Sequence, residues 1–517
     1  MPNIHEAAVG TILALLFWIY LRYKPLRRAP EPPGPAGIPI FGNEFQIPQD
    51  KQWLRFHEWS KVYGDVVRLT TMGQPVIILS SAQAAVDLLD ARGTVYSDRP
   101  RAVMAGELVG WDRGLGYSPY NSRFKEFRRM FQHTLGPRPV QSLIPLQERE
   151  NARFLLRVLI YPNDFIEHAR QSTGAAILMI SYGYAIQPND DPFVKIAEEA
   201  MKGFSKSSEP GAFMVDRFPF FQYVPEWFPG AGFKRAAREM REDLERLYDV
   251  PYEFVRKQMA SGNASPSFTS KYLNEKRDTA AFDDDFVKAA AASLYSGGAD
   301  TTPSAVTTFI LAMVHNRHVQ SLGQAEVDNV IGHERLPTIA DKGDLVYVGA
   351  IVREVLRWGV TVPLGLPHQV SQDDVYRGYS IRKGTIIWAN IWSILHDENY
   401  FPKPNEFRPE RYLKTDDYDP SEILRHCDPL AIAFGFGRRI CPGMHLAENS
   451  LFLTVATILA TFDIAKATDA DGNEITPEVE FSGFISHPRP FRCKITPRSE
   501  TAAELVRSYV VADQSIG

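Results

Sequence analysis

Apolar side chains recur every three or four positions along much of the chain, the spacing that places them on one face of a helix. The run Val348, Ile351, Val352 and Val355 is an example. The pattern predicts helices around residues 121–135, 145–160, 232–260, 283–316, 345–358 and 444–462. Branched apolar runs at 66–70 and 76–80 predict a hairpin of strands, and a second strand-like patch covers 375–388. We therefore expect a mainly α fold with a small β region.

The first residues form a different kind of segment. Residues 7–21 carry no charge, and a helix of that length spans roughly 22 Å, slightly less than a bilayer core of about 30 Å. Arg22 and Lys24 follow and can snorkel to the lipid headgroups. A cleaved signal peptide, the alternative, carries its basic residues before the apolar run. We expect a transmembrane anchor within residues 1–25, with the rest of the chain in the cytosol.

A proline-rich stretch at residues 26–42 predicts a stiff hinge rather than a random loop. Residues 43–517 contain no internal repeat or low-complexity segment and are predicted to form one body. The composition is 44% hydrophobic and 23% charged, and the formal net charge of -5 gives no sign of nucleic-acid binding. The three cysteines, Cys427, Cys441 and Cys493, are too few for a disulfide framework and indicate a reducing compartment.

Cys441 lies in a glycine-rich stretch, residues 434–443, just before a predicted helix. Pro442 is expected at the first helical position, where proline is best tolerated. The free N–H groups and the positive dipole end of a helix start favour a thiolate over a thiol. The glycines let the backbone pass close to a flat ligand, and Arg439 can pair with a carboxylate of that ligand. An ordinary buried cysteine in a loop is the alternative.

This stretch matches F-x-x-G-x-R-x-C-x-G at every fixed position and resembles the signature of the cytochrome P-450 family. The resemblance implies the fold of that family and a haem b group whose iron is held by the Cys441 thiolate, a ligand that favours O–O cleavage. It also implies haem contacts from Phe434, Gly443 and Arg439, with Arg439 on a propionate. Residues 226–235, 374–379 and 486–493 resemble basidiomycete-like fungal members of secondary metabolism, similar to the O-methylsterigmatocystin oxidoreductase group.

A predicted helix over 289–314 is interrupted in its middle by Gly297, Gly298 and Pro303. Each glycine costs roughly 1 kcal/mol in a helix interior, and proline removes a helical hydrogen bond, so we expect a local opening or kink. The stretch resembles the family's G-G-x-D-T-T motif. The resemblance implies that Thr301 donates a hydrogen bond to bound dioxygen and that Asp300 relays protons. Small residues that serve close helix packing are the alternative.

Glu354 and Arg357 lie three residues apart and share a helix face. They resemble the family's E-x-x-R pair, with Arg411 as its third member, and the resemblance implies an architectural role in holding the Cys441 loop. An exposed pair of little energetic value is the alternative.

Two further haem contacts follow from the resemblance. Arg128 ends a W-x-x-x-R-like pattern in which Phe124 replaces tryptophan and loses one N–H donor. His368 follows Pro367, where the family often places a basic residue on a propionate. A surface histidine is the alternative for His368.

The walls of a substrate site are expected from residues 101–120, 362–366 and 484–486, and from Leu294, Tyr295 and Ala299. Most of these side chains are apolar, which favours a hydrophobic or aromatic substrate. The aromatic stretch 218–228 either dips into the membrane surface or packs beneath a loop. No flavin or nicotinamide signature is visible. The resemblance therefore implies electrons from NADPH–cytochrome P-450 reductase, with a basic docking face to which Lys125, Arg129 and Arg438 could contribute; isolated surface charges are the alternative.

These features together predict a haem-thiolate monooxygenase of the endoplasmic reticulum membrane. It would insert one oxygen atom of O2 into a terpenoid, polyketide or indole-type molecule, in secondary metabolism or xenobiotic oxidation. Two alternatives stay open. A haem-thiolate isomerase or dehydratase would need no reductase, and Asp300 and Thr301 argue against it. A haem sensor would not turn over at all.

Overall fold

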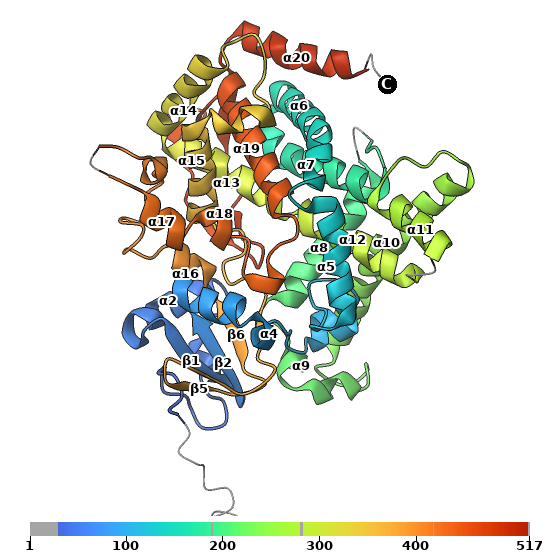
Figure 1. The fold of residues 1–517 in the computed structure, drawn as a ribbon, viewed down its shortest axis with the longest axis vertical. Helices are drawn as coiled ribbons and strands as arrows, with labels where there is room; N and C mark the ends of the chain where they lie inside the picture. The colour runs from blue at the N-terminus through green and yellow to red at the C-terminus, as the bar shows by residue number, and fades with distance from the viewer. Residues whose placement is uncertain (1–28, 188–189, 280–282, 417, 515–517) are drawn as a thin grey trace, which may run out of the picture.

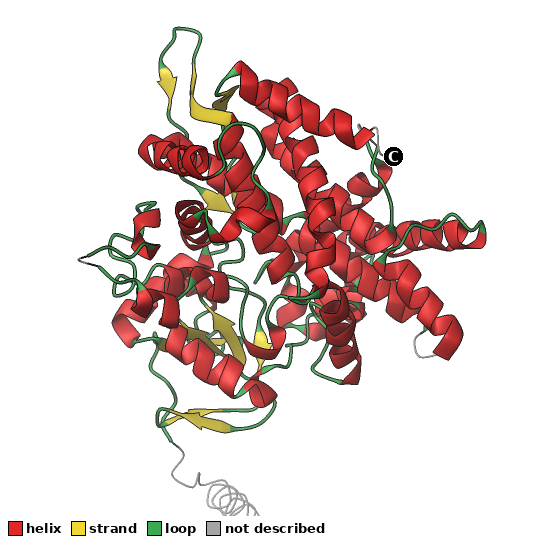
Figure 2. Ribbon diagram, turned by 45° about the horizontal axis from the view of Figure 1, so that its top comes forward, coloured by secondary structure: helices red, strands yellow, loops and turns green. Residues whose placement is uncertain are grey.

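The computed structural model describes residues 29–187, 190–279, 283–416 and 418–514, and helices make up most of them (Figure 1; Figure 2). The longer helices are α2 (Gln52–Tyr63), α5 (Ser122–Leu135), α6 (Ile144–Ile160), α7 (Phe165–Tyr182), α8 (Pro192–Ser208), α10 (Gly232–Ala260), α11 (Phe268–Thr279), α12 (Asp284–Ala299), α13 (Thr301–His315), α14 (Arg317–Val330), α15 (Val346–Trp358), α19 (Met444–Thr461) and α20 (Glu500–Gln514). Shorter ones are α3 (Ala82–Ala85), α4 (Gly93–Tyr96), α9 (Met214–Arg217), α16 (Ile391–Leu395), α17 (Ser421–His426) and α18 (Pro429–Ile432). The mainly α prediction is confirmed.

The strands form small sheets at the edges of this helical body (Figure 2). The largest has the order β1-β2-β6-β3, in which β1 and β2 form the predicted antiparallel hairpin and β6 pairs in parallel with β2. Its strands are β1 (Val66–Thr71), β2 (Gln74–Leu79), β3 (His368–Gln369) and β6 (Ile386–Ala389). The others are β4 (Asp374–Tyr376) with β5 (Tyr379–Ile381), β9 (Phe481–Ser482) with β10 (His487–Pro488), and β7 (Phe462–Thr468) between β8 (Glu474–Ile475) and β11 (Cys493–Pro497).

Two helices at the centre of the molecule, α13 and α19, are buried on all sides over most of their length (Figure 1). Every residue from Pro303 to Val314 is buried, as is every residue from Leu451 to Leu459. A helix can be apolar all round only where other elements surround it. α13 continues from α12, and α19 follows the Cys441 loop. These two buried helices therefore adjoin the two segments that the sequence singles out, the interrupted stretch at 297–303 and the cysteine loop.

The boundaries differ from the sequence expectation in two informative places. The predicted helix over 283–316 is two helices, because Asp300 (φ −119°, ψ −25°) separates α12 from α13. The break falls between Gly298 and Pro303, where the helical hydrogen bonding is weakest. At the other site, α19 begins at Met444 with Gly443 as its N-cap. Pro442 therefore precedes the helix, and the expectation that it occupies the first helical position is wrong.

The predicted membrane anchor at residues 7–21 lies outside the described residues. Within the part of the chain that the structure describes, no helix is both long and apolar enough to cross a membrane. The proline-rich stretch from Pro30 onward contacts β1 of the first sheet and β5 of the β4–β5 sheet. The Arg68 amide donates to the Pro33 carbonyl (2.8 Å), and the Ser380 amide donates to that of Pro30 (2.8 Å). A Cβ at Gly34 would lie only 1.9 Å from the Arg68 carbonyl oxygen, so glycine permits this close approach.

Candidate active site

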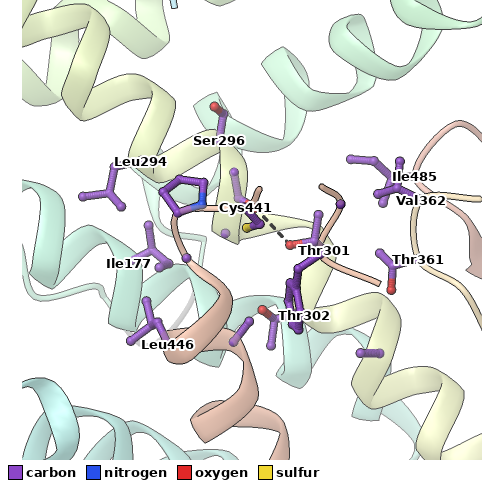
Figure 3. A pocket seen from close by; sticks show the side chains of 18 of the residues that line it. Ile177, Leu294, Ser296, Thr301, Thr302, Thr361, Val362, Cys441, Leu446 and Ile485 are labelled. Carbon is purple, nitrogen blue, oxygen red and sulfur yellow. Dashed lines mark hydrogen bonds between the residues drawn. The ribbon is translucent and has the colours of Figure 1, made fainter. Parts of the chain in front are cut away.

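A cavity of about 410 Å³ lies between α12, α13, α19 and the loops that lead into β3 and α19. Figure 3 shows Cys441 and Thr301 near its middle. Aliphatic side chains from four separate segments surround them, namely Ile177, Leu294, Val362 and Ile485. The cavity therefore brings together the cysteine loop and the interrupted helix, which lie about 140 positions apart in the sequence.

The loop that carries Cys441 is closed by its own backbone. The Cys441 amide donates to the Phe434 carbonyl (2.8 Å), and Phe434, Cys441 and Gly443 all line the cavity. Gly435 has φ +81°, and a Cβ there would meet no atom within 4 Å, so its backbone borders open space. Gly437 serves another purpose, because a Cβ there would lie 2.1 Å from the Leu89 carbonyl oxygen. Its close approach is to the protein backbone and not to a ligand.

The Cys441 thiol is subject to opposing influences. Burial raises its pKa, while the Gly443 N–H and the Arg128 guanidinium oppose that rise. The expected stabilisation of a thiolate by an N–H group at the helix start is therefore present, with a contribution from Arg128 that was not expected, but burial outweighs both. A metal ion bound at this sulfur would reverse the balance, since a coordinated thiol is deprotonated.

Three arginines, Arg99, Arg128 and Arg439, line the cavity and form what we call its arginine end. Burial, followed by the proximity of Arg99, lowers the pKa of Arg439 to about 8. Burial also lowers the pKa of Arg99 to about 10 and shifts that of Arg128 downward. Buried cations that repel one another are stable only beside an anion. The arginine end thus has the electrostatics of a site for carboxylates.

The hydrogen bonds of these arginines leave room for such a ligand. Arg439 donates from Nε to the Ser97 carbonyl (2.8 Å) and from Nη2 to the Ser118 carbonyl (2.7 Å), and its Nη1 is buried without a partner among the described residues. Its guanidinium lies 3.7 Å from the centre of the Phe124 ring, so phenylalanine in place of tryptophan gives a cation–π contact. Arg128 donates to the Ile440 carbonyl (2.6 Å), beside Cys441. The unpartnered donor fits a haem propionate.

His368 is buried at the same end of the cavity, so it is not a surface histidine. Its Nδ1 lies 2.7 Å from the Tyr96 carbonyl, which places a proton on Nδ1 and leaves Nε2 of the neutral ring as an acceptor. Burial, reinforced by Arg99, lowers its pKa to about 3. A carboxylate beside Nε2 would counteract this effect by favouring the doubly protonated ring.

At the junction of α12 and α13 the two predicted catalytic residues, Asp300 and Thr301, lie in different surroundings. Thr301 lines the cavity, and its hydroxyl donates to the Gly297 carbonyl (2.9 Å). Asp300 does not line the cavity. Its Oδ1 lies 3.1 Å from Nε2 of His487, on the outer side of the junction. His487 is a partner that no sequence motif indicated.

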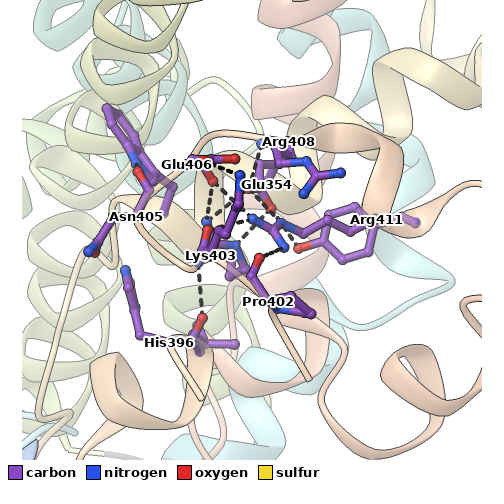
Figure 4. A network of polar contacts seen from close by, with 12 residues as sticks. Glu354, His396, Pro402, Lys403, Asn405, Glu406, Arg408 and Arg411 are labelled. Carbon is purple, nitrogen blue, oxygen red and sulfur yellow. Dashed lines mark hydrogen bonds and ion pairs between the residues drawn. The ribbon is translucent and has the colours of Figure 1, made fainter. Parts of the chain in front are cut away.

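The predicted architectural network is present and fully buried (Figure 4). Arg357 donates to both oxygens of Glu354, with Nε–Oε2 and Nη2–Oε1 distances of 2.8 Å. Arg411 donates to Oε1 (3.2 Å), as does the Arg408 amide (2.8 Å), and the Tyr412 hydroxyl donates to Oε2. The network directly fixes the segment 402–412. The network is connected to the Cys441 loop through α15. Helix α18 packs on α15, and in the sequence α18 directly precedes the loop that begins at Phe434.

The walls of the cavity largely follow the expectation. Leu294, Val362, Phe484 and Ile485 line it, together with residues 114–117. Tyr295 and Ala299 do not line it, and the Tyr295 hydroxyl donates instead to the Phe193 carbonyl (3.0 Å).

One residue of the wall, Phe204, has no counterpart among the sequence predictions. Phe204 of α8 contacts Trp111, Tyr117 and Phe484, with ring centroids 4.8, 6.1 and 5.9 Å away. We call these four rings the aromatic wall. Because they come from three separate segments, around residues 111–117, 204 and 484, no local pattern could have placed them together.

These features define the class of site: one cysteine and a cluster of cations line the same largely apolar cavity, as a haem-thiolate protein requires. The family model for cytochrome P-450 matches residues 32–495. The chain is 46% identical to a cytochrome P-450 monooxygenase numbered 208 from Postia placenta, over 96% of both chains. It is 45% identical to the monooxygenase claR of Ampulloclitocybe clavipes, over 98% of this chain and 93% of that relative. It is 38% identical to the tryptamine 4-monooxygenase of Psilocybe cyanescens, over 93% and 96%.

The chain belongs to the cytochrome P-450 family. It is a haem-thiolate monooxygenase that receives its electrons from a redox partner and transfers one atom of O2 to a small molecule.

Proposed function

We propose that Cys441 is the iron ligand and that Arg99, Arg128 and Arg439 hold the haem propionates, with His368 beside them. The observation that carries this proposal is the shared cavity, which is lined by one thiol and by three arginines whose pKa values are lowered by burial. Phe434 and Gly443 border the position of the ring. When bound, the haem supplies the centre at which dioxygen is reduced and split.

Within this arrangement Thr301 offers a hydroxyl to the reacting oxygen. Its hydrogen bond to the Gly297 carbonyl can be exchanged for one to the reacting oxygen by a rotation about χ1. Asp300, the preceding residue in the chain, holds and releases protons on the outer side of the junction. The break between α12 and α13 allows a cavity-facing hydroxyl and an outward-facing carboxylate at adjacent positions.

We further propose an uncharged substrate with a flat or bulky apolar skeleton. The aromatic wall offers faces on which such a skeleton can stack. The carboxylates among the described residues that line the cavity are Glu150 and Glu448. They come from α6 and α19 and already pair with Arg153 (2.8 Å) and Lys342 (2.7 Å). An ammonium group beside the aromatic wall would be buried without a counter-ion, which is costly.

A matched pair of ligands tests the substrate proposal. Tryptamine and 3-ethylindole share a ring system and a two-carbon side chain, but only tryptamine carries an ammonium group at neutral pH. In optical titrations of the haem spin state we expect 3-ethylindole to bind about tenfold or more tightly. Phe204→Leu should weaken 3-ethylindole binding by removing a stacking face. Equal or tighter binding of tryptamine would contradict the proposal of an uncharged substrate.

We propose NADPH–cytochrome P-450 reductase as the electron donor, docking near the Cys441 loop. Arg438 belongs to that loop, and Arg438 and Lys125 both lie over the Tyr120 ring, with centroid distances of 5.4 and 5.3 Å. Arg129 is two-thirds exposed and pairs with Glu126 (2.8 Å). These cations are placed to meet an acidic partner surface and to speed its association.

We also propose attachment to the endoplasmic reticulum membrane through residues 7–21, with the catalytic body facing the cytosol and the segment up to residue 42 leading into it. A contact of the body itself with lipid is supported by exposed apolar side chains. Phe220 and Trp227 are 60% and 81% exposed, which does not fit the alternative of core aromatics. Arg217, close by in α9, pairs with Glu44, which brings Ile40 and Phe45 (86% and 71% exposed) to the same region. We call Ile40, Phe45, Phe220 and Trp227 the apolar patch.

A further inference from the structure

Asp300 has a partner from a distant part of the chain. Its Oδ1 lies 3.1 Å from Nε2 of His487, and the two side chains are 22% and 23% exposed. Among the described residues, His487 is the one basic side chain in ion-pair contact with Asp300. The pair is therefore partly accessible to solvent, and one of its members directly precedes Thr301.

The backbone at His487 is held in place by hydrogen bonds of the preceding residue, Ser486. Ser304 of α13 donates from Oγ to the Ser486 carbonyl (2.6 Å), and the Ser486 amide donates to the Thr361 carbonyl (2.7 Å). His487 itself pairs with Ser482 in the β9–β10 ribbon. Because Thr361 and Ile485 line the cavity, the same short segment connects the cavity wall to Asp300.

Other charged groups surround the pair. Glu198 of α8 is close enough to sense Asp300. Burial is the main cause that raises the pKa of Glu198, with Glu167 and Asp300 adding to the rise and Arg170 and Lys202 opposing it. Asp300 thus faces a second carboxyl group, and a cation at His487 offsets the repulsion between them. A positive charge on His487 adds Coulomb attraction to its hydrogen bond with the carboxylate, so the strength with which Asp300 is held depends on the charge of His487.

We propose that His487 is a positioning residue for Asp300. In its charged form His487 donates from Nε2 to Oδ1 and holds the carboxylate at the α12–α13 junction, so that protons reach the Thr301 side of the cavity. Loss of that charge loosens the carboxylate and slows proton supply. The enzyme thereby gains a pH dependence that Asp300 alone would not provide. The inference rests on the proposed roles of Asp300 and Thr301.

The consequence can be measured without knowledge of the substrate. In NADPH-driven oxygen reduction with reductase and no substrate, one NADPH, one proton and one O2 yield NADP⁺ and H2O2. Alternatively, two NADPH, two protons and one O2 yield two NADP⁺ and two H2O. Splitting the O–O bond needs protons at the site, so the fraction of NADPH electrons recovered as peroxide rises when proton supply fails.

The test compares the full-length, haem-loaded protein with His487→Gln and His487→Lys variants between pH 6 and 8.5. Glutamine keeps a donor but never a charge, whereas lysine stays charged throughout. We expect the wild-type peroxide fraction to rise with pH. In the glutamine variant the peroxide fraction should be high at every pH, at least about twofold above the wild type at the acidic end. In the lysine variant it should be low at every pH. His318→Gln, on an exposed part of α14 outside the cavity lining, is the matched control and should follow the wild type.

A second measurement does not depend on turnover. In ¹⁵N-histidine-labelled protein, the Nε2 resonance of His487 is identified by its loss in His487→Gln. It should move in Asp300→Asn and stay in place in Asp285→Asn, a carboxylate of α12 that pairs with Arg113. A wild-type profile in His487→Gln, or a pH slope that persists in both variants, overturns the inference. If Asp300→Asn also leaves the peroxide fraction unchanged, the proposed role of Asp300 is wrong as well; if Asp300→Asn raises it, only the role of His487 falls.

Discussion

Two threonines of α13 make nearly identical hydrogen bonds, yet only one of them borders the cavity. Thr301 donates to the Gly297 carbonyl (2.9 Å) and Thr307 donates to the Pro303 carbonyl (2.8 Å), each four residues back. Thr301 lines the cavity and Thr307 does not. Comparing substitutions at these two threonines separates the structural effect of losing a hydroxyl from an effect on the reaction.

We predict that Thr301→Ala raises the peroxide released per NADPH by roughly threefold or more, because a donor near the reacting oxygen is lost. Thr307→Ala should match the wild type in this ratio. Peroxide and NADPH are measured in the same reductase-containing assay. Equal ratios in the two variants would remove the role proposed for Thr301.

Single residues also mark the limit of sequence reasoning. Arg128 and Arg439 could be named because they fall at fixed positions of local patterns. Arg99 could not, since it joins the arginine end only through tertiary contacts. It donates to the carbonyls of Gly116, Leu366 and Pro367, which belong to two segments distant from one another in sequence. The same holds for His487, which reaches Asp300 only because strand β10 lies beside α13.

At the level of elements, α15 and the segment 402–412 depend on one another through a buried ion pair. Glu354 and Arg357 are both fully buried. Removing one partner of such a pair leaves an uncompensated charge in the interior. Glu253 and Arg256 of α10 have the same i, i+3 spacing but are 45% and 54% exposed.

We predict that Arg357→Leu lowers the free energy of unfolding by about 3–5 kcal/mol and impairs haem retention. Arg256→Leu, the matched control, should change it by less than about 1 kcal/mol. Chemical denaturation followed by circular dichroism measures both. Similar losses in the two variants would mean that the buried network does not organise the fold.

The periodicity of apolar residues is sufficient to predict the long helices. The two glycines and the proline are sufficient to predict the break at Asp300, because both features depend on local chemistry. The start of α19 at Met444 agrees with the predicted range, but Pro442 lies outside the helix, since the Cys441–Gly443 turn is held by a backbone hydrogen bond to Phe434 that no local propensity encodes. The strand-like patch at 375–388 is divided among three strands. Short strands take their bounds from their partners, which a single sequence does not reveal.

For the whole molecule, the apolar patch (Ile40, Phe45, Phe220 and Trp227) lies beside the point where the chain enters the body. A predicted anchor at residues 7–21 would hold that face against the lipid. We predict that deletion of residues 1–29 moves most of the protein from the membrane to the soluble fraction. Added Phe220→Asp and Trp227→Asp changes should release the remainder, because a charge in the lipid interface is unfavourable.

The control for this prediction is Val62→Asp, a substitution at a 73% exposed apolar position on α2. It should release no additional protein. Sedimentation of membranes at low and high salt measures each fraction. Complete retention of the truncated protein would mean that a surface other than residues 7–21 is the principal anchor.

The most direct test concerns the sulfur that defines the site. Cys427 and Cys493 are buried free thiols whose pKa burial raises to about 12, and neither lines the cavity, whereas Cys441 does. In the reduced, carbon monoxide-bound protein we predict that Cys441→Ser abolishes the red-shifted Soret band of thiolate ligation. Cys427→Ser and Cys493→Ser should keep that band. A band that persists in Cys441→Ser would contradict the assignment of this cysteine to the haem iron.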